Sequence, residues 1–254
     1  LFPTLAISRY FKKKYHAGLT YGMRINRPGE NVLNPQVENS DPVNISYGNP
    51  GLKPSVTHQA ELTFGTFREK WSVSPRIGYS DTRRIIERVR TVGSDGISRS
   101  TYENMARSRS YTFHLSGNYR PVRKVRTTGA VTLSQRFYDT ENKSLLQRNG
   151  LSFRSNLGVS WQLPRRLAFE SDLRYSSNTS AQGRNRGSVT SSFSGRKSVW
   201  NNRLSIRLSA QDPFYRRNTE EFSEGTNFRL HRSTITSTES FSVSLGYRFT
   251  RAAE

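Results

Sequence analysis

Two carboxylates placed two positions apart are the best candidates in this sequence for acid–base chemistry. Glu170 and Asp172 are two positions apart in a segment whose alternate positions include Phe169, Leu173 and Tyr175, so in a β-strand both carboxylates would lie on one face. Such a pair can transfer protons when its surroundings separate the two pKa values. The alternation puts Arg154 and Arg174 on the same polar face, where opposite charges on neighbouring strands stabilise a sheet. We therefore interpret these residues as a charge ladder, and we predict no catalytic residue.

The remaining reactive residue types do not form a recognisable site. The four histidines (His16, His58, His114 and His231) fall in separate segments, without HExxH or any other paired metal-ligand spacing. The chain has no cysteine, which excludes disulfides, thiol catalysis and Cys-based zinc sites. It also lacks a P-loop and a GxGxxG motif. We predict that the protein is not an enzyme and has neither a metal site nor a cofactor.

A long polar segment, 26–55, is the strongest candidate for ligand contact. It could form a structured lid, or its flanking motifs RINRP (24–28) and GNPGLKP (48–54) could be rigid turns that never touch a ligand. Both interpretations stay open. The candidate ligand contacts are Arg24, Arg27, Tyr47, Asn49, His114 and Arg154. The candidate structural-motif residues are Pro28, Asn34, Pro35, Gly48, Pro50, Pro54, Asp212 and Phe214.

Alternation with a period of two defines the elements that would position these residues. In the segment 15–25, apolar and aromatic residues alternate with polar residues and glycines, which predicts a strand with one apolar face and one polar face. The same pattern predicts eleven strands in all. They cover about 1–10, 15–25, 56–64, 71–80, 110–119, 125–137, 151–163, 167–176, 188–199, 204–210 and 228–249.

The predicted connections alternate between short and long. Short connections are expected near 12–14, 67–70, 120–124, 164–166 and 201–202, and long ones at 26–55, 81–107, 138–149, 177–187 and 211–227. Outer-membrane barrels have short periplasmic turns and longer extracellular loops. A soluble β-sandwich has no reason to sort its connections in this way, so the order favours a transmembrane barrel.

Aromatic residues fall at both ends of the apolar faces, and aliphatic residues lie between them. Amphipathic rings settle at the two interfaces of a bilayer, so this placement predicts two aromatic girdles around a lipid-facing band. A general preference of strands for aromatic residues would explain their number but not their placement. The predicted interface residues are Tyr15, Trp71, Tyr79, Tyr111, Tyr119, Trp161, Tyr175, Tyr247 and Phe249.

The chain carries 40 Lys and Arg against 19 Asp and Glu, a formal net charge of +21. The basic residues cluster in the predicted connections and do not form one stripe. This distribution fits anionic lipid headgroups, including lipopolysaccharide phosphates, better than nucleic acid, which requires one contiguous basic face. An ordinary solvated surface is the alternative.

Strand parity limits how the predicted barrel can close. With the long loops outside the cell, all odd strands descend to the periplasm, and the eleventh ends there at Phe249. We prefer one long strand over 228–249 to a reversal at 236–239, which would leave the C-terminus outside. The first and last strands then run in the same direction and cannot pair in antiparallel fashion. The chain is therefore expected to be the C-terminal part of a larger barrel with an even strand number.

Motifs along nearly the whole chain support this expectation. LFPTLAISRYF (1–11), RINRP, LNP (33–35), GNPGLKP, LSAQDPF (208–214) and the terminal FSVSLGYRF (241–249) resemble the C-terminal half of TonB-dependent outer-membrane receptors and related outer-membrane barrels. The resemblance implies a barrel of about 22 strands. It also implies a luminal plug domain and energy supplied by TonB, and nothing in this chain matches the plug or the TonB-contacting segment.

The sequence thus predicts an all-β antiparallel membrane barrel segment, residues 1–254, in the outer membrane of a Gram-negative bacterium. The predicted function is nutrient import as part of a TonB-dependent receptor, with the bilayer, lipopolysaccharide, the N-terminal strands, the plug, TonB and a small nutrient as partners. A passive porin-like or structural barrel is one alternative. A soluble basic β-protein that binds polysaccharide or nucleic acid is another.

Overall fold

One large sheet contains all strands of the described residues. The computed structural model describes residues 2–12, 14–38, 40–139, 149–225 and 227–249. They form a sheet of fourteen strands, antiparallel except for the short pairing of β3 with β6. The strands are β1 (Thr4–Phe11), β2 (Tyr15–Asn26), β3 (Asn44–Ser46), β4 (Ser55–Phe67), β5 (Trp71–Val92), β6 (Ser98–Tyr119), β7 (Val125–Asp139), β8 (Gly150–Leu163), β9 (Leu167–Ser180), β10 (Gly183–Val199), β11 (Leu204–Gln211), β12 (Arg217–Glu224), β13 (Arg229–Thr236) and β14 (Ser240–Tyr247).

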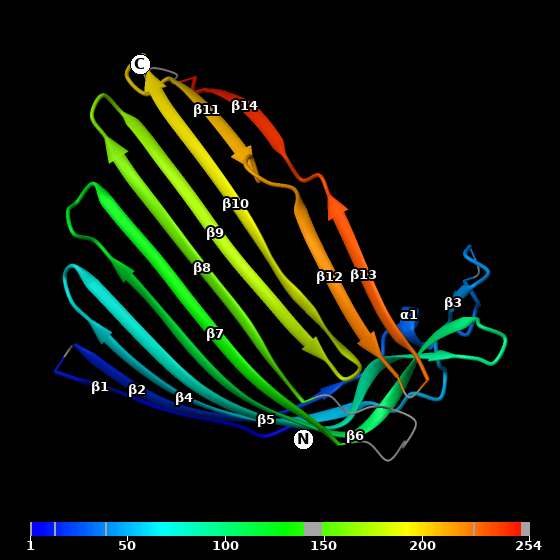
Figure 1. The fold of residues 1–254 in the computed structure, drawn as a ribbon. Coiled ribbons are helices and arrows are strands. Elements are labelled where there is room, and N and C mark those ends of the chain that lie inside the picture. The colour runs from blue at the N-terminus through cyan, green and yellow to red at the C-terminus, as the bar shows by residue number, and fades with distance from the viewer. Residues whose placement is uncertain (1, 13, 39, 140–148, 226, 250–254) are drawn as a thin grey trace.

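The wall of the sheet follows chain order. Eleven strands pair in the sequence β1-β2-β4-β5-β6-β7-β8-β9-β10-β11-β14, so the predicted fold class and the predicted wall of eleven strands are confirmed. Figure 1 shows these strands side by side in a curved wall, with short turns at one end. Among the described residues, β1 pairs only with β2, and β14 pairs only with β11. Both edges of the wall are therefore open.

The last two positions of the wall are each occupied by a broken strand. β11 and β12 both pair antiparallel with β10, so they run in the same direction across the break at 212–216. β13 and β14 pair with β12 and β11, so they also share one direction. The chain does not reverse at 237–239, as we predicted. It is interrupted there, which we did not predict. The prediction of one long loop over 211–227 was wrong, because β12 (Arg217–Glu224) lies within that segment.

Two other predicted loops are largely strands. β5 and β6 each extend for 22 residues and enclose a turn of five residues, 93–97, in place of the predicted loop over 81–107. Arg84 has a φ of 54°, which interrupts the alternation just where Ile85 and Ile86 stand side by side. The predicted loop over 177–187 is a tight turn between β9 and β10. The predicted connection over 138–149 falls mainly on 140–148, outside the described residues.

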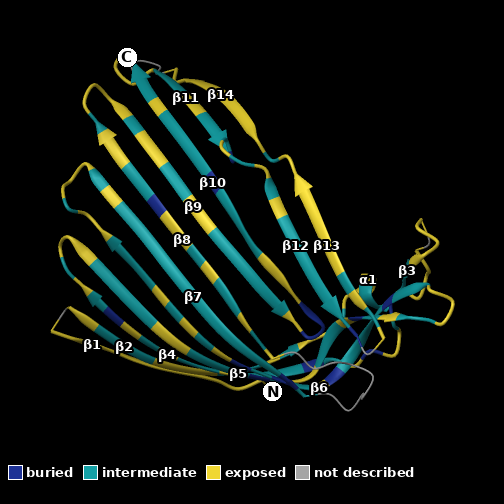
Figure 2. Cartoon of the chain, in the orientation of Figure 1, coloured by how far each residue is buried: buried dark blue, intermediate teal, exposed yellow. Residues whose placement is uncertain are grey.

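The two faces of the wall have opposite character. Side chains of the apolar face, such as Ile77, Leu157 and Leu208, remain exposed to the surroundings. Figure 2 shows exposed and intermediate residues along the strands of the wall. A small buried apolar cluster lies beyond the wall, at the long-loop end, and comprises Val89, Met105, Tyr138 and Ala181.

The helix α1 (Glu30–Leu33) has four residues. No helix in the described part of the chain is long and apolar enough to cross a membrane.

Candidate functional site

Hydroxyl groups dominate the polar face of the wall and bond to each other between strands. Ser80 and Ser110 are 2.8 Å apart at their Oγ atoms, and Thr112 Oγ1 lies 3.2 Å from Ser134 Oγ. Thr57 Oγ1 and Thr82 Oγ1 make the same kind of contact at 2.9 Å. These pairs arise because the strand register places polar residues of neighbouring strands directly opposite each other. In these parts of the polar face, short side chains on neighbouring strands therefore satisfy each other.

Charged side chains on this face form a loose network. Asp172 lies 3.9 Å from Arg174, and Glu170 lies 4.0 Å from Arg207. Arg154 does not contact either carboxylate; its Nη2 donates to Asn178 Oδ1 at 3.0 Å. The two carboxylates therefore each have an arginine partner, as a charge ladder requires. Weak exposed pairs of this kind contribute at most about 1 kcal/mol each.

The apolar face carries the predicted aromatic residues in two rows. In three strands an aromatic pair is separated by eight positions: Trp71 and Tyr79, Tyr119 and Tyr111, Trp161 and Phe153. Rings of the row near the long loops touch across strands, with centroids 5.1 Å apart for Tyr79 and Tyr111. At about 3.3 Å per residue, eight positions correspond to roughly 26 Å of strand. An aliphatic band therefore separates the two rows.

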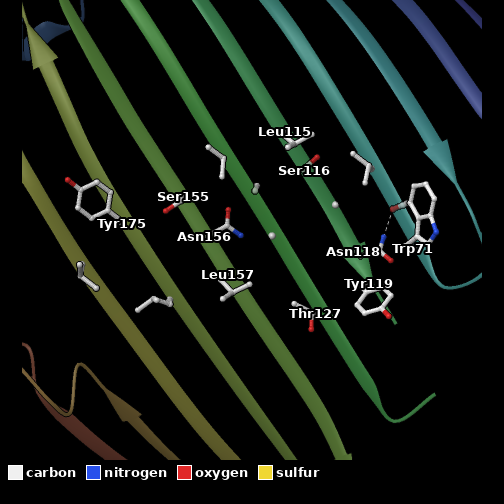
Figure 3. Close-up of a pocket in the computed structure, with 18 residues that line it drawn as sticks. Trp71, Leu115, Ser116, Asn118, Tyr119, Thr127, Ser155, Asn156, Leu157 and Tyr175 are labelled. Atoms are coloured by element: carbon white, nitrogen blue, oxygen red, sulfur yellow. Dashed lines mark hydrogen bonds between the residues drawn. The ribbon is translucent and has the colours of Figure 1, made fainter. Parts of the chain in front are cut away.

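A groove crosses this apolar band (Figure 3). It has a volume of about 650 Å³ and is lined by residues of β5 to β10. Gly117 and Gly129 pair with each other in register, so two neighbouring positions of the face lack side chains. Trp71, Tyr119 and Leu157 border the groove. Its apolar borders suit hydrocarbon and offer no charged group to a polar ligand.

The segment between β2 and β4 is a compact, hydrogen-bonded loop. Gly48 N donates to Asn34 O and Asn49 N donates to Val32 O, both at 2.8 Å. A Cβ atom on Gly48 would lie 2.5 Å from Asn34 O, so this close approach requires glycine. Asn49 is fully engaged: its Oδ1 accepts from Gly51 N and its Nδ2 donates to Tyr102 O. GNPG therefore acts as a rigid turn element.

This loop lies along the extended β5–β6 hairpin and encloses a polar cavity with it. β3 pairs with the start of β6, and Tyr47 N donates to Ser100 O at 3.1 Å. The cavity between loop and hairpin has a volume of about 760 Å³. Its lining includes Asn31, Gln36, Glu38, Tyr47, Arg88 and Tyr102. Tyr47, a predicted ligand contact, thus lines a cavity.

The far end of the β5–β6 hairpin is attached to connections between strands that are not its neighbours in the wall. Gln182 Oε1 accepts from Arg90 N at 2.8 Å, and Gln182 Nε2 donates to Arg90 O at 3.1 Å. Asn227 Nδ2 donates to Val92 O at 2.7 Å. Because β7 and β8 separate the hairpin from β9 and β10, these bonds require the hairpin to cross the long-loop end of the wall. The crossing hairpin covers the polar side.

The hairpin carries a half-buried carboxylate, Glu87, on β5. Tyr138 donates to Glu87 Oε1 at 3.3 Å, and Arg136 Nη1 donates to the Tyr138 hydroxyl at 3.1 Å. Burial raises the pKa of Glu87, and this effect outweighs the opposing influence of Arg136 and Tyr138. Burial also lowers the pKa of the nearby Arg90 guanidinium. Both groups therefore carry a desolvation cost that depends on how firmly the hairpin is docked.

Asp212 joins the two strand breaks to the rest of the wall. Its side chain is fully buried and accepts from Ser191 N and Thr238 Oγ1, both at 2.6 Å, and from Arg217 Nη2 at 3.1 Å. Arg217 begins β12 and Thr238 lies in the break before β14, so one carboxylate holds both interruptions. Phe214, predicted with it as a structural residue, is exposed, and its ring contacts Phe193 at a centroid distance of 5.5 Å.

The other predicted contacts do not converge on one site. Arg24 and Arg27 are exposed at the base of the loop. His114 Nδ1 lies 2.9 Å from Thr132 Oγ1 within the wall. Arg88, Tyr102 and Gln182 were missed, because the sequence assigned their segments to loops. In the described ranges, no group of three or more His, Asp or Glu side chains could hold a metal ion.

Residues 1–247 match the model of the outer membrane protein beta-barrel family. A search of curated proteins finds no match.

Several solved structures share the fold. The siderophore receptor PirA of Pseudomonas aeruginosa is 15% identical, with a TM-score of 0.59 over 84% of this chain. The copper transporter OprC is 11% identical, with a TM-score of 0.69 over 97% of this chain. The FrpB iron transporter of Neisseria meningitidis is 11% identical, with a TM-score of 0.61 over 98%. The chain covers 38%, 39% and 38% of these three structures, respectively.

Proposed function

The chain belongs to the outer membrane protein beta-barrel family, and we propose that it forms the C-terminal part of the barrel of a TonB-dependent transporter that imports a nutrient. The protein lies in the outer membrane of a Gram-negative bacterium. Its apolar face contacts lipid there, and its polar face lines the lumen. This family membership excludes the alternative of a soluble basic β-protein. The structures that share its fold are transporters and receptors, not enzymes.

The open edges of the wall support a larger barrel. β1 and β14 run in the same direction, so they cannot close the wall against each other in antiparallel fashion. Each unpaired backbone group in lipid costs several kcal/mol. A complementary wall with an odd number of strands, ascending at both ends, would pair both edges. N-terminal strands of the same polypeptide are the proposed partner, and they would bring the total to an even number.

The crossing hairpin is the observation that favours active import over passive diffusion as the function. The β5–β6 hairpin leaves the wall, passes over the lumen side and is held there by Gln182 and Asn227. A passive pore requires a clear mouth, whereas a transporter holds its ligand at a covered mouth before release. The proposed partners are a luminal plug and TonB. Lipopolysaccharide is the proposed neighbour of the outer membrane surface, where exposed arginines face anionic headgroups.

Conductance and TonB binding together test this proposal. The protein, purified from outer membranes at its natural length, is inserted into planar bilayers in KCl solution and is also incubated with the periplasmic domain of TonB. A TonB-dependent transporter should show no steady conductance and should retain TonB. Steady conductance without TonB retention would establish the passive barrel instead.

A further inference from the structure

We propose that the cavity between the β2–β4 loop and the β5–β6 hairpin binds a neutral saccharide. This inference rests on the proposed function, because it names the ligand class taken up at the same mouth. The cavity volume of about 760 Å³ lies within the range of about 300–1,000 Å³ that small-molecule sites occupy. Its walls are two hydrogen-bonded elements joined by β3, so the cavity is preformed.

Unused hydrogen-bonding groups converge on this cavity from both walls. Asn31, Gln36 and Tyr47 come from the loop, and Tyr102 comes from β6. Within the described part of the chain, none of these four side chains makes a hydrogen bond. By contrast, Asn34 and Asn49 of the same loop use their amides to hold the backbone. Donors and acceptors that the fold itself does not use are available for the hydroxyl groups of a ligand.

The charges of the lining favour a neutral ligand. Arg88 and Glu38 are the charged residues among its lining, one of each sign. No cluster of three or more His, Asp or Glu side chains occurs in the residues that the structure describes, so a bare metal ion has no ligand set there. An anionic chelate would require an excess of positive charge. A polar ligand without net charge fits the lining best.

Aromatic surface separates a saccharide from other neutral ligands. Tyr47, which follows β3, and Tyr102, on β6, are half-buried and line the same cavity. The apolar faces of such rings can cover the C–H face of a sugar ring, while hydroxyls and amides bond its edges. An extended peptide would need a free strand edge. β3 offers none, because one edge pairs with β6 and the other is bridged by Glu38.

Ligand binding by the purified protein tests the inference. Detergent-solubilised protein of natural length is titrated calorimetrically with neutral trisaccharides built from glucose, mannose, galactose, xylose or N-acetylglucosamine. Ferric citrate and an uncharged tetrapeptide are the comparison probes. At least one trisaccharide should bind saturably, and neither comparison probe should displace it. Binding of only ferric citrate or only the peptide would overturn the inference.

Variants locate the binding site. Y47A and Y102A should each weaken saccharide binding at least tenfold, and Q36A should weaken it several-fold. N218A, which removes a polar side chain on β12 outside the cavity, should leave the affinity unchanged. Y47F and Y102F keep the aromatic rings and replace the alanine variants if those do not fold. Because each loses the hydroxyl group that would bond the saccharide, both should still bind it more weakly. Unchanged affinity in all tyrosine variants would overturn the site. Saccharide binding without TonB retention would refute the transporter and leave the saccharide site intact.

Discussion

The side-chain amide of Gln182 pairs with both backbone groups of Arg90, although 92 positions separate the two residues. The amide thereby takes the place of a neighbouring strand for one residue of β5. Because Gln182 stands in the turn between β9 and β10, this pair, together with the bond from Asn227 to Val92 O, holds the crossing hairpin to the far side of the mouth.

Replacement of Gln182 by alanine should release the end of the hairpin. Two hydrogen bonds are lost, and about 1–3 kcal/mol of docking free energy corresponds to roughly 5- to 150-fold more frequent opening. Hydrogen–deuterium exchange over 85–105 should accelerate accordingly. Q162A removes an amide near a short turn at the opposite end of the wall and should leave this exchange unchanged. Equal protection in Q182A and the unaltered protein would show that the apolar cluster alone docks the hairpin.

Alanine at Gly48 should disrupt the compact loop. The added Cβ would lie 2.5 Å from Asn34 O and 2.7 Å from Val32 O, both of them backbone atoms that cannot move independently. Overpacking of this kind costs about 1–3 kcal/mol. A glutamate-specific protease should therefore cleave after Glu30 more quickly. G195A is the matched control, because no atom lies within 4 Å of its added Cβ. Unchanged cleavage in G48A would contradict the rigid-turn interpretation.

Asparagine at Asp212 should destabilise the last two wall positions. The buried carboxylate accepts from Ser191 N, Thr238 Oγ1 and Arg217 Nη2, and hydrogen bonds to a charged group contribute about 1.5–3 kcal/mol. D212N should lower the free energy of unfolding by about 2 kcal/mol, measured by urea titration in detergent. D172N alters an exposed carboxylate and should change it by less than about 0.5 kcal/mol. A similar small effect for D212N would mean that the breaks need no carboxylate.

Hairpin docking should weaken as the pH rises. Burial raises the pKa of Glu87 above its ordinary value of 4.5, so the protonated form is favoured in the docked state. The contribution of this group to docking is complete below its undocked pKa and is lost as the pH rises through the raised, docked value. The ¹³C-methyl signal of Met105, in the adjacent cluster, should report this change in a pH titration.

The variant E87Q should abolish that dependence, because its side chain has no proton to lose. E69Q, at an exposed position beside a short turn, should retain the pH profile of the unaltered protein. A Met105 signal that shifts with pH in E87Q as it does in the unaltered protein would assign the titration to another group.

The wall of the barrel could be predicted from sequence because its signal is local. From Tyr15 to Ile25, and again from Leu151 to Leu163, the alternation of apolar and polar residue types indicates which face most side chains occupy, and the register follows from it. The signal fails at Arg84, where a φ of 54° interrupts the alternation. It fails again at Asp212 and Pro213, which suggest a loop although β12 resumes five residues later.

The site was harder to predict for a related reason. Tyr47 could be proposed from its place in a long polar segment. Arg88, Tyr102 and Gln182 gain their meaning only from contacts between distant segments, and Gln182 meets Arg90 without any pattern that links the two. The role of a residue that acts through a tertiary contact cannot be recognised from the periodicity of the sequence.

The hydroxyl wall has a consequence for any body that moves along it. Ser80 and Ser110, like Thr112 and Ser134, already satisfy each other, and their side chains are too short to grip a passing surface. A moving partner exchanges one hydrogen bond for an equivalent one at each step, with a net difference of about 1 kcal/mol or less. Along these hydroxyl pairs the free-energy profile is then shallow, whereas charged side chains of the same face, such as Asp172 and Arg174, interrupt it. The passage of such a partner along the barrel therefore depends more on the contacts that hold it at the mouth than on the hydroxyl pairs of the wall.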